Sequence, residues 1–297
     1  MNPISATGPT LSRQLLNKVP EVTIFFWLIK IMATTVGETA ADFLNENVGL
    51  GLTVTSLLMS ILLIAALVVQ FSRKKYVPSV YWMAVVLISV VGTLITDNLT
   101  DGFGVPLIAS TIVFGVALMI TFAAWYAVEN TLSIHTIFTR RRESFYWAAI
   151  LFTFALGTAA GDYVSEEMGV GYAKGAIIFG GLIAVITALH YLSKAMLAKD
   201  SQRHTSNAVL AFWLAYILTR PLGASIGDLL TQPSSAGGLG LGTNVVTAIF
   251  TISIIALVAF LSVTRIDVTS RDEIEHDEAE RLEHLDALKP QLETVGD

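Results

Sequence analysis

The chain has no cysteine, few histidines and little charge. Its 297 residues include no Cys and five His, and only 14% are Asp, Glu, Lys or Arg, whereas 54% are hydrophobic. The lack of cysteine excludes disulfides, thiol catalysis and thiolate metal sites. The scarcity of charge excludes an ordinary soluble domain, in which about a quarter of the residues are charged. The composition therefore indicates an integral membrane protein.

The formal net charge of −6 comes from the C-terminal end of the chain. Residues 265–297 include eleven acidic and four basic side chains, whereas the 264 residues before them include thirteen acidic and fourteen basic ones. A nearly neutral body with an acidic tail is unsuited to nucleic acid, because phosphate binding requires a basic surface. We expect the lipid bilayer as a partner and no nucleic acid.

Eight apolar stretches are long enough to cross the roughly 30 Å of a hydrocarbon core, which takes about 20 helical residues. Their hydrophobic runs are continuous rather than alternating, so they predict helices and not a barrel. The expected fold class is all-α, with an N-terminal segment 1–20, a membrane domain 21–264 and an acidic tail 265–297. The spans are placed near 21–44, 50–71, 79–99, 106–129, 144–165, 171–196, 207–230 and 242–264.

Basic residues favour one set of connections between the spans. Residues 73–75, residues 140–142 and Lys194 follow the second, fourth and sixth spans, whereas the opposite connections contain Lys174 as their one base. Loops rich in Lys and Arg stay in the cytoplasm. We expect a multi-pass protein of the bacterial inner membrane with both termini in the cytoplasm.

One motif occurs four times along the chain. It consists of an aromatic residue and Trp, nine residues, Gly, four residues and Asp, and its copies recur at offsets of 55, 65 and 66. Chance does not supply four copies at fixed spacing, so the chain is built from internal repeats. The motif residues are Trp27, Gly37 and Asp42; Trp82, Gly92 and Asp97; Trp147, Gly157 and Asp162; and Trp213, Gly223 and Asp228.

Each motif copy opens one two-helix unit, with repeats at about 21–75, 76–140, 141–206 and 207–264. Since every unit contains two spans, all units have the same orientation, as in parallel repeats about an axis along the membrane normal. We expect the four motif-bearing helices to surround that axis, with their motif glycines allowing close helix approach.

The first motif copy resembles a known family. The segment 18–23, of sequence Lys-Val-Pro-Glu-Val-Thr, leads into Trp27, Gly37–Glu38–Thr39 and Asp42. In this it is similar to the bacterial uncharacterised membrane-anchored protein family, which is built on a repeat of unknown function. The resemblance covers residues 18–264 and implies an integral membrane protein of repeated hairpins. It implies no activity.

Five carboxylates are expected inside the membrane. If the Trp residues mark the inner interface, an Asp fifteen positions later lies about 22 Å along the helix. Glu38, eleven positions after Trp27, lies about 16 Å along, near the midplane. Acidic groups in a bilayer core are costly and indicate a functional site. The alternative is that each Asp caps the neighbouring loop. The set proposed as metal ligands is Asp42, Asp97, Asp162, Asp228 and Glu38.

Two basic residues accompany these acids. Arg220 lies about 10 Å past Trp213 and precedes Pro221, which predicts an interrupted helix there. We expect Arg220 to be either a counter-charge for the aspartates or a direct substrate contact. Lys30 lies only about 4–5 Å past Trp27 and is expected to extend back to the cytoplasmic surface.

The favoured interpretation is a transporter of a small hard cation. Oxygen-only ligands suit divalent ions such as Mn²⁺, and clustered carboxylates could exchange protons for the ion. Two alternatives remain: a transporter of an anion or small organic solute bound through Arg220, and a membrane scaffold or sensor without transport. The spans contain no zinc-hydrolase spacing such as His-x-x-x-His, so no enzyme activity and no cofactor is expected.

The alternation of basic loops makes the topology testable. A periplasm-active reporter fused after residue 264 should be inactive, because the eighth span returns the chain to the cytoplasm. The same reporter fused within the connection 45–49 should be active. Activity after residue 264 would refute the eight-span topology.

Overall fold

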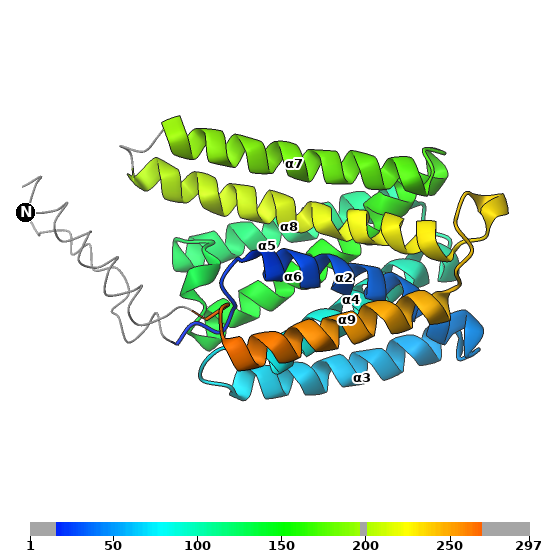
Figure 1. The fold of residues 1–297 in the computed structure, drawn as a ribbon, viewed down its shortest axis with the longest axis horizontal. Helices are drawn as coiled ribbons and strands as arrows, with labels where there is room; N and C mark the ends of the chain where they lie inside the picture. The colour runs from blue at the N-terminus through cyan, green and yellow to red at the C-terminus, as the bar shows by residue number, and fades with distance from the viewer. Residues whose placement is uncertain (1–15, 197–200, 269–297) are drawn as a thin grey trace, which may run out of the picture.

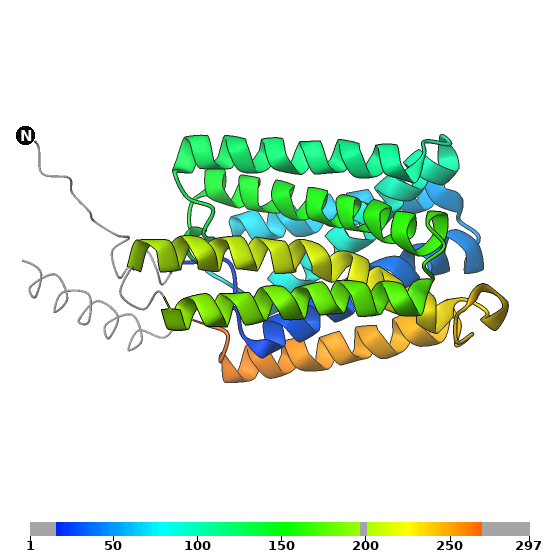
Figure 2. The same cartoon turned by 90° about the horizontal axis from the view of Figure 1, so that it is seen from above.

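A computed structural model describes residues 16–196 and 201–268, without the side chains of 195–206. This part of the chain is all helical, and eight of its helices are long and apolar enough to cross a membrane. They lie side by side in one bundle (Figures 1 and 2). The helices are α2 Ile24–Asp42, α3 Gly51–Ser72, α4 Pro78–Asp97, α5 Leu107–Glu129, α6 Arg140–Asp162, α7 Tyr172–Met196, α8 Ser201–Thr231 and α9 Thr243–Thr264.

Local sequence sets several helix starts. The Thr23 side chain accepts a hydrogen bond from the Phe26 amide at the start of α2, and Thr139 does the same for Arg142 at the start of α6. Pro78 occupies the first turn of α4, where its missing amide is not needed. The spans predicted from the sequence are therefore confirmed, with small shifts at their ends.

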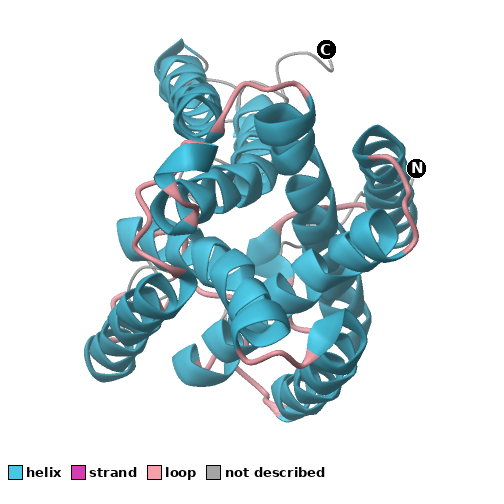
Figure 3. Cartoon of the chain, turned by 90° about the vertical axis from the view of Figure 1, so that its right-hand side faces the viewer, coloured by secondary structure: helices cyan, strands magenta, loops and turns pink. Residues whose placement is uncertain are grey.

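The four motif-bearing helices form a closed inner ring. α2 packs on α4, α4 on α6, α6 on α8, and α8 on α2. Their apolar windows are more than half buried, whereas less than a quarter of each window in α3, α5, α7 and α9 is buried. Figure 3 looks along this bundle, with the remaining helices at the periphery. The prediction that the motif helices surround a central axis is confirmed.

The outer helices connect successive repeats. α3 packs on α4, α5 on α6, α7 on α8, and α9 returns to α2. The two helices of one repeat are thus a hairpin in sequence, but each outer helix packs chiefly on the inner helix of the next repeat. Because α9, the last outer helix, packs on α2, the first inner helix, this pattern of contacts continues around the whole bundle.

The motif glycines lie where neighbouring inner helices are closest. A Cβ built on Gly92 would lie 2.6 Å from the Phe154 Cβ, and one on Gly157 would lie 2.5 Å from the Arg220 Cβ. Gly37 faces Ser89 and Gly223 faces Thr34 in the same way. Each glycine therefore meets the residue three positions before the glycine of the next repeat, which confirms their predicted role in close packing.

The bundle has two chemically distinct ends. The basic end carries the two described chain ends and the connections 73–77 and 130–139, on the left in Figure 1. The acidic end carries the four motif aspartates and the connections after them. These two names are used below.

Substitution of a motif glycine should destabilise the ring. Gly92→Ala would force its new methyl group against the Phe154 Cβ, with an expected loss of about 1–3 kcal/mol. Gly181→Ala on α7 is the matched control, since no atom lies within 4 Å of its Cβ position. Thermal unfolding in detergent measures both. Equal stability of the two variants would contradict the close-packing role.

Candidate functional site

Arg220 lies at the centre of the inner ring with no exposed surface. Its Nε donates to the Thr158 hydroxyl at 3.1 Å, and one terminal nitrogen donates to the Thr34 carbonyl at 2.5 Å. The other terminal nitrogen lies 2.7 Å from Glu38 Oε2, and also donates to the hydroxyls of Thr93 and Thr158. Residues from all four inner helices therefore meet at this one guanidinium, which we call the Arg220 hub.

The contacts of the hub favour one of the two roles predicted for Arg220, that of a counter-charge over that of a direct substrate contact. All three guanidinium nitrogens are bonded to the protein, and the ion-pair partner is Glu38. Asp228 makes no ion pair with Arg220 and interacts with it only at longer range. Arg220 is thus an internal counter-charge, and its partner is the midplane acid rather than the nearest aspartate.

The predicted interruption at Arg220–Pro221 is wrong. α8 runs unbroken through Pro221. The helix continues because its neighbour makes room: Pro221 lies against Gly157 and Gly161 of α6, whose missing side chains accommodate the ring. Close packing of this kind can retain a proline inside a membrane helix.

The predicted placement of Lys30 is also wrong. Its side chain is fully buried instead of extending to the surface. The ammonium lies 4.0 Å from the ring centre of Phe154 and 4.3 Å from that of Tyr216, and Nζ has no hydrogen-bond partner among the residues that the structure describes. Aromatic faces attract cations, so these rings replace the expected contact with water. Lys30 adds a second basic group one helical turn from Thr34, beside the hub.

The four motif aspartates form a second ring at the acidic end. Asp97 interacts electrostatically with Asp42, Asp162 with Asp97 and Asp228, and Asp228 with Asp42. Each also interacts with Glu38, which lies between them and the hub. That the four lie at one level in the membrane stays a prediction. We call these four residues the aspartate ring.

The carboxylates of the aspartate ring have no direct partners. Asp42, Asp97 and Asp162 make no capping hydrogen bond, although each directly precedes a π-helical turn. In residues 16–196 and 201–268, no hydrogen bond or ion pair involves any of the four side chains. Asp228 is buried and the other three are half-buried. The loop-capping alternative therefore has no support in the geometry.

No complete metal site is assembled at the aspartate ring. Among the described residues, no three His, Asp or Glu side chains lie close enough together to hold a metal ion. Glu38, the fifth residue of the set predicted to bind metal, is instead paired with Arg220. Binding of a metal by these five residues stays a prediction.

Aromatic side chains from all four motifs fill the bundle on the basic side of the hub, and we call them the aromatic cluster. The aromatic residue of each motif packs on the Trp of the next one: Phe26 on Trp82 at 5.6 Å, Tyr81 on Trp147 at 5.6 Å, Tyr146 on Trp213 at 6.3 Å and Phe212 on Trp27 at 5.8 Å, measured between ring centroids. Three of the motif tryptophans, Trp82, Trp147 and Trp213, are buried in the bundle, whereas Trp27 is half-buried.

The N-terminal segment 17–21 closes the basic end, a role that the sequence did not predict. The buried Lys18 ammonium lies 2.5 Å from Glu143 Oε2, and Gln70 donates to Glu143 Oε1 at 3.2 Å. Lys18 also bonds through its amide to the carbonyl of Ile137. The one available signal was the Lys-Val-Pro-Glu-Val-Thr segment, whose charged residues lie just outside a span.

The start of the C-terminal segment is attached at the same place. Glu21 donates its amide to the Asp267 carbonyl at 2.9 Å, and the Tyr76 hydroxyl donates to the Asp267 carboxylate at 2.6 Å. Burial raises the pKa of Asp267, while the hydrogen bond from Tyr76 opposes that shift. Residues 269–297, which include most of the acidic tail, lie outside the described part of the chain.

The chain matches one family model four times. The model is described as Repeat of Unknown Function (DUF347), and it matches residues 25–76, 80–131, 145–195 and 211–267. These matches confirm the resemblance seen in the first motif copy. No curated protein and no solved structure matched the chain.

Removal of one member of the hub pair should destabilise the protein more than removal of both. Arg220→Met leaves Glu38 buried without its partner, with an expected loss of about 3–5 kcal/mol. The double variant Glu38→Gln/Arg220→Met should recover a substantial part of that loss. Denaturant unfolding in detergent measures the difference.

Arg141→Met is the control for this comparison. The Arg141 side chain is 66% exposed and pairs with Glu129 at the basic end, so its loss should cost less than about 1 kcal/mol. A double hub variant as unstable as the worse single variant would argue against pairing as the source of the stability.

Proposed function

The chain belongs to the family built on this repeat of unknown function. We propose that the protein transports a small hard cation along the axis of the inner ring. The observation that supports this most is the aspartate ring. Four carboxylates, one from each repeat, lie together at the acidic end without a hydrogen bond or ion pair among the described residues. Carboxylates in a membrane protein require a counter-charge, and a cation arriving from that end supplies it.

The class of cation follows from the available donors. The inner ring offers carboxylate and hydroxyl oxygens and no thiolate, which suits Mg²⁺, Mn²⁺ or Ca²⁺ rather than a soft metal. Since no three acidic side chains of the described residues lie close enough to hold a bare ion, the aspartate ring would first attract the cation with its water shell. Rings of acidic side chains select cations in this way in channels.

The hub supplies the barrier to further movement. Glu38 is the next carboxylate along the axis, and its Oε2 forms an ion pair with Arg220 at 2.7 Å. A divalent cation that reached this level would compete with the guanidinium for Glu38, and transport would require the pair to separate. Beyond the hub, Lys30 and the aromatic cluster close the path in the described arrangement.

The rival functions have less support. An anion or organic solute that binds directly to Arg220 would have to compete with Glu38, Thr34 and Thr158, which already accept hydrogen bonds from the guanidinium. A scaffold with loop-capping aspartates would need hydrogen bonds that Asp42, Asp97 and Asp162 do not make. In the proposed orientation the basic end faces the cytoplasm of a bacterial inner membrane and the aspartate ring faces outward.

Neutralisation of the aspartate ring tests the transport proposal. In proteoliposomes, Asp97→Asn should sharply reduce Mn²⁺ uptake, and Asp97→Asn/Asp228→Asn should reduce it little further, because one lost charge already weakens a shared site. Asp101→Asn is the matched control, since this exposed acid lies at the same end outside the ring. Uptake is measured with a metal-sensitive dye inside the vesicles.

The stability of the same variants separates a shared site from four independent caps. Caps predict losses of about 1 kcal/mol per Asp→Asn substitution that add together. A shared site predicts unchanged or increased stability without metal, since repulsion between carboxylates is relieved. Additive destabilisation with unaltered Mn²⁺ uptake would refute the proposal.

A further inference from the structure

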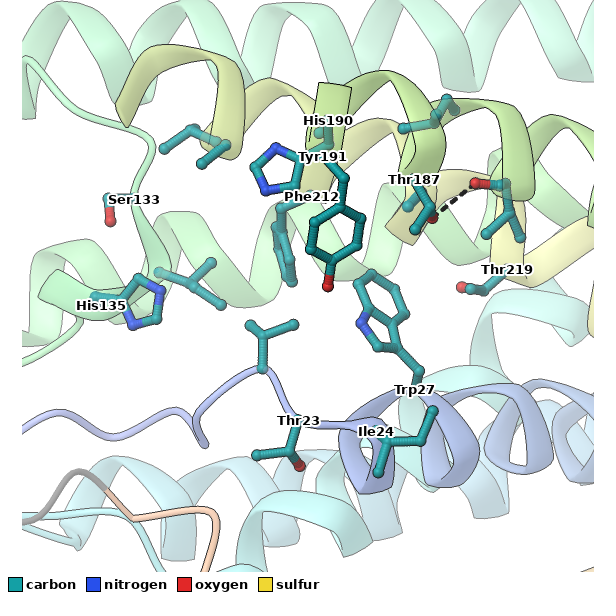
Figure 4. Close-up of a pocket in the computed structure, with 18 of the residues that line it drawn as sticks. Thr23, Ile24, Trp27, Ser133, His135, Thr187, His190, Tyr191, Phe212 and Thr219 are labelled. Carbon is teal, nitrogen blue, oxygen red and sulfur yellow. Dashed lines mark hydrogen bonds between the residues drawn. The ribbon is translucent and has the colours of Figure 1, made fainter. Parts of the chain in front are cut away.

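A groove on the side of the bundle lies apart from the central axis. It has a volume of about 640 Å³ and is lined by α2, α7, α8 and the connection between α5 and α6. It lies where the first and last repeats meet, beside the contact of α2 with α8 (Figure 4). A volume of this size is within the range of ligand pockets, about 300–1,000 Å³.

The groove is apolar along its length and polar at one end. Trp27, Phe212 and Tyr191 contribute aromatic walls (Figure 4). Two threonines farther along are satisfied within their own helices, because Thr187 donates to the Ile183 carbonyl and Thr219 to the Tyr216 carbonyl. Apart from the Tyr191 hydroxyl, which points toward Trp27 in Figure 4, the polar groups that can meet an occupant gather at the basic end. They belong to Thr23, Ser133, His135 and His190.

The groove is as deep as one leaflet. Its lining on α8 runs from Ala208 to Thr219, eleven positions or about 16 Å along the helix. That is about half of a 30 Å hydrocarbon core. An occupant with its polar part at the interface and its apolar part reaching the midplane matches both the depth and the polarity.

The polar end offers a hydrogen-bond donor to such an occupant. His135 Nδ1 lies 3.3 Å from Glu21 Oε2, and the His135 side chain is 53% exposed. The hydrogen bond with Glu21 raises the pKa of His135, so the imidazolium is favoured and its other nitrogen can donate outward. A phosphate group is the anionic group that a membrane lipid presents at this depth.

We propose that the groove binds one phospholipid of the leaflet at the basic end, with an acyl chain along the packed side chains of Trp27 and Phe212 and its phosphate beside His135. The site is independent of the transport proposal. It touches the hub through the backbone: Thr219 lines the groove and directly precedes Arg220, and the Thr219 carbonyl accepts a hydrogen bond from Thr34 at 3.2 Å. The lipid would therefore support the α2–α8 contact that positions Arg220.

Tryptophan fluorescence can test the acyl chain directly. Trp27 is half-buried and lines the groove, whereas Trp82, Trp125, Trp147 and Trp213 are buried. Full-length protein in phosphatidylglycerol vesicles with brominated acyl chains should show quenching, because bromine quenches tryptophan on contact. Trp27→Phe should lose most of it. Retention of the full quenching in Trp27→Phe would place the contact elsewhere and overturn the proposal.

A second variant tests the proposal by filling the groove with a larger side chain. Ala211→Phe places an aromatic ring in the groove and should remove most of the quenching of Trp27. Ala65→Phe on the exposed face of α3 is the matched control and should quench like the unchanged protein. Equal quenching in both variants would mean that the chain does not enter the groove. Quenching that emerges only when the protein is diluted in lipid would mean that a second copy covers it, which also overturns the proposal.

The role of the phosphate is tested in detergent micelles. A brominated phosphatidylglycerol should quench Trp27 at lower concentration than a brominated diacylglycerol with the same chains, and His135→Gln should reduce that difference. Equal quenching by the two molecules would exclude phosphate recognition at His135.

Discussion

The close approach of the four inner helices is the constraint on which the rest of the structure depends. Each motif glycine lies against a side chain of the next repeat, as Gly157 does against Arg220. With a methyl group at these positions the helices would separate, and no single guanidinium could reach Thr34, Thr93 and Thr158 together. The hub exists because the glycines bring Thr34, Thr93 and Thr158 within hydrogen-bond distance of Arg220.

The ring is closed by chain connectivity as well as by packing. Each outer helix covers the inner helix of the next repeat, and α9 covers α2. One repeat alone could not pair the polar side chains of its inner helix, since their partners lie on other repeats. The four repeats therefore form one assembly, and equivalent positions in different repeats can hold different residues. Glu38 and Arg220 are the clearest case: they stand on the first and last repeats and pair across the junction.

This departure from symmetry gives the bundle its chemistry. Four equal repeats would put four like groups around the axis, as they do at the aspartate ring. Near the midplane the repeats instead provide Lys30, which lies between two aromatic rings, and an ion pair of Glu38 with Arg220 that the hydroxyls of Thr93 and Thr158 contact. Buried charges require such pairing. The four carboxylates of the aspartate ring have no such basic partner among the described residues.

The sequence determined the membrane class, the eight spans and the four repeats, because hydrophobic length and exact spacing are local properties of the chain. It also indicated that Arg220 would be internal. It could not identify Glu38 as the partner, since the nearest acid on the same helix is Asp228, and partner choice depends on how α2 and α8 meet. The burial of Lys30 between two rings, the closure of the basic end by Lys18 and Glu143, and the unbroken α8 at Pro221 likewise required the tertiary structure. Each of these depends on side chains that lie far apart in the sequence and come together only when the ring closes.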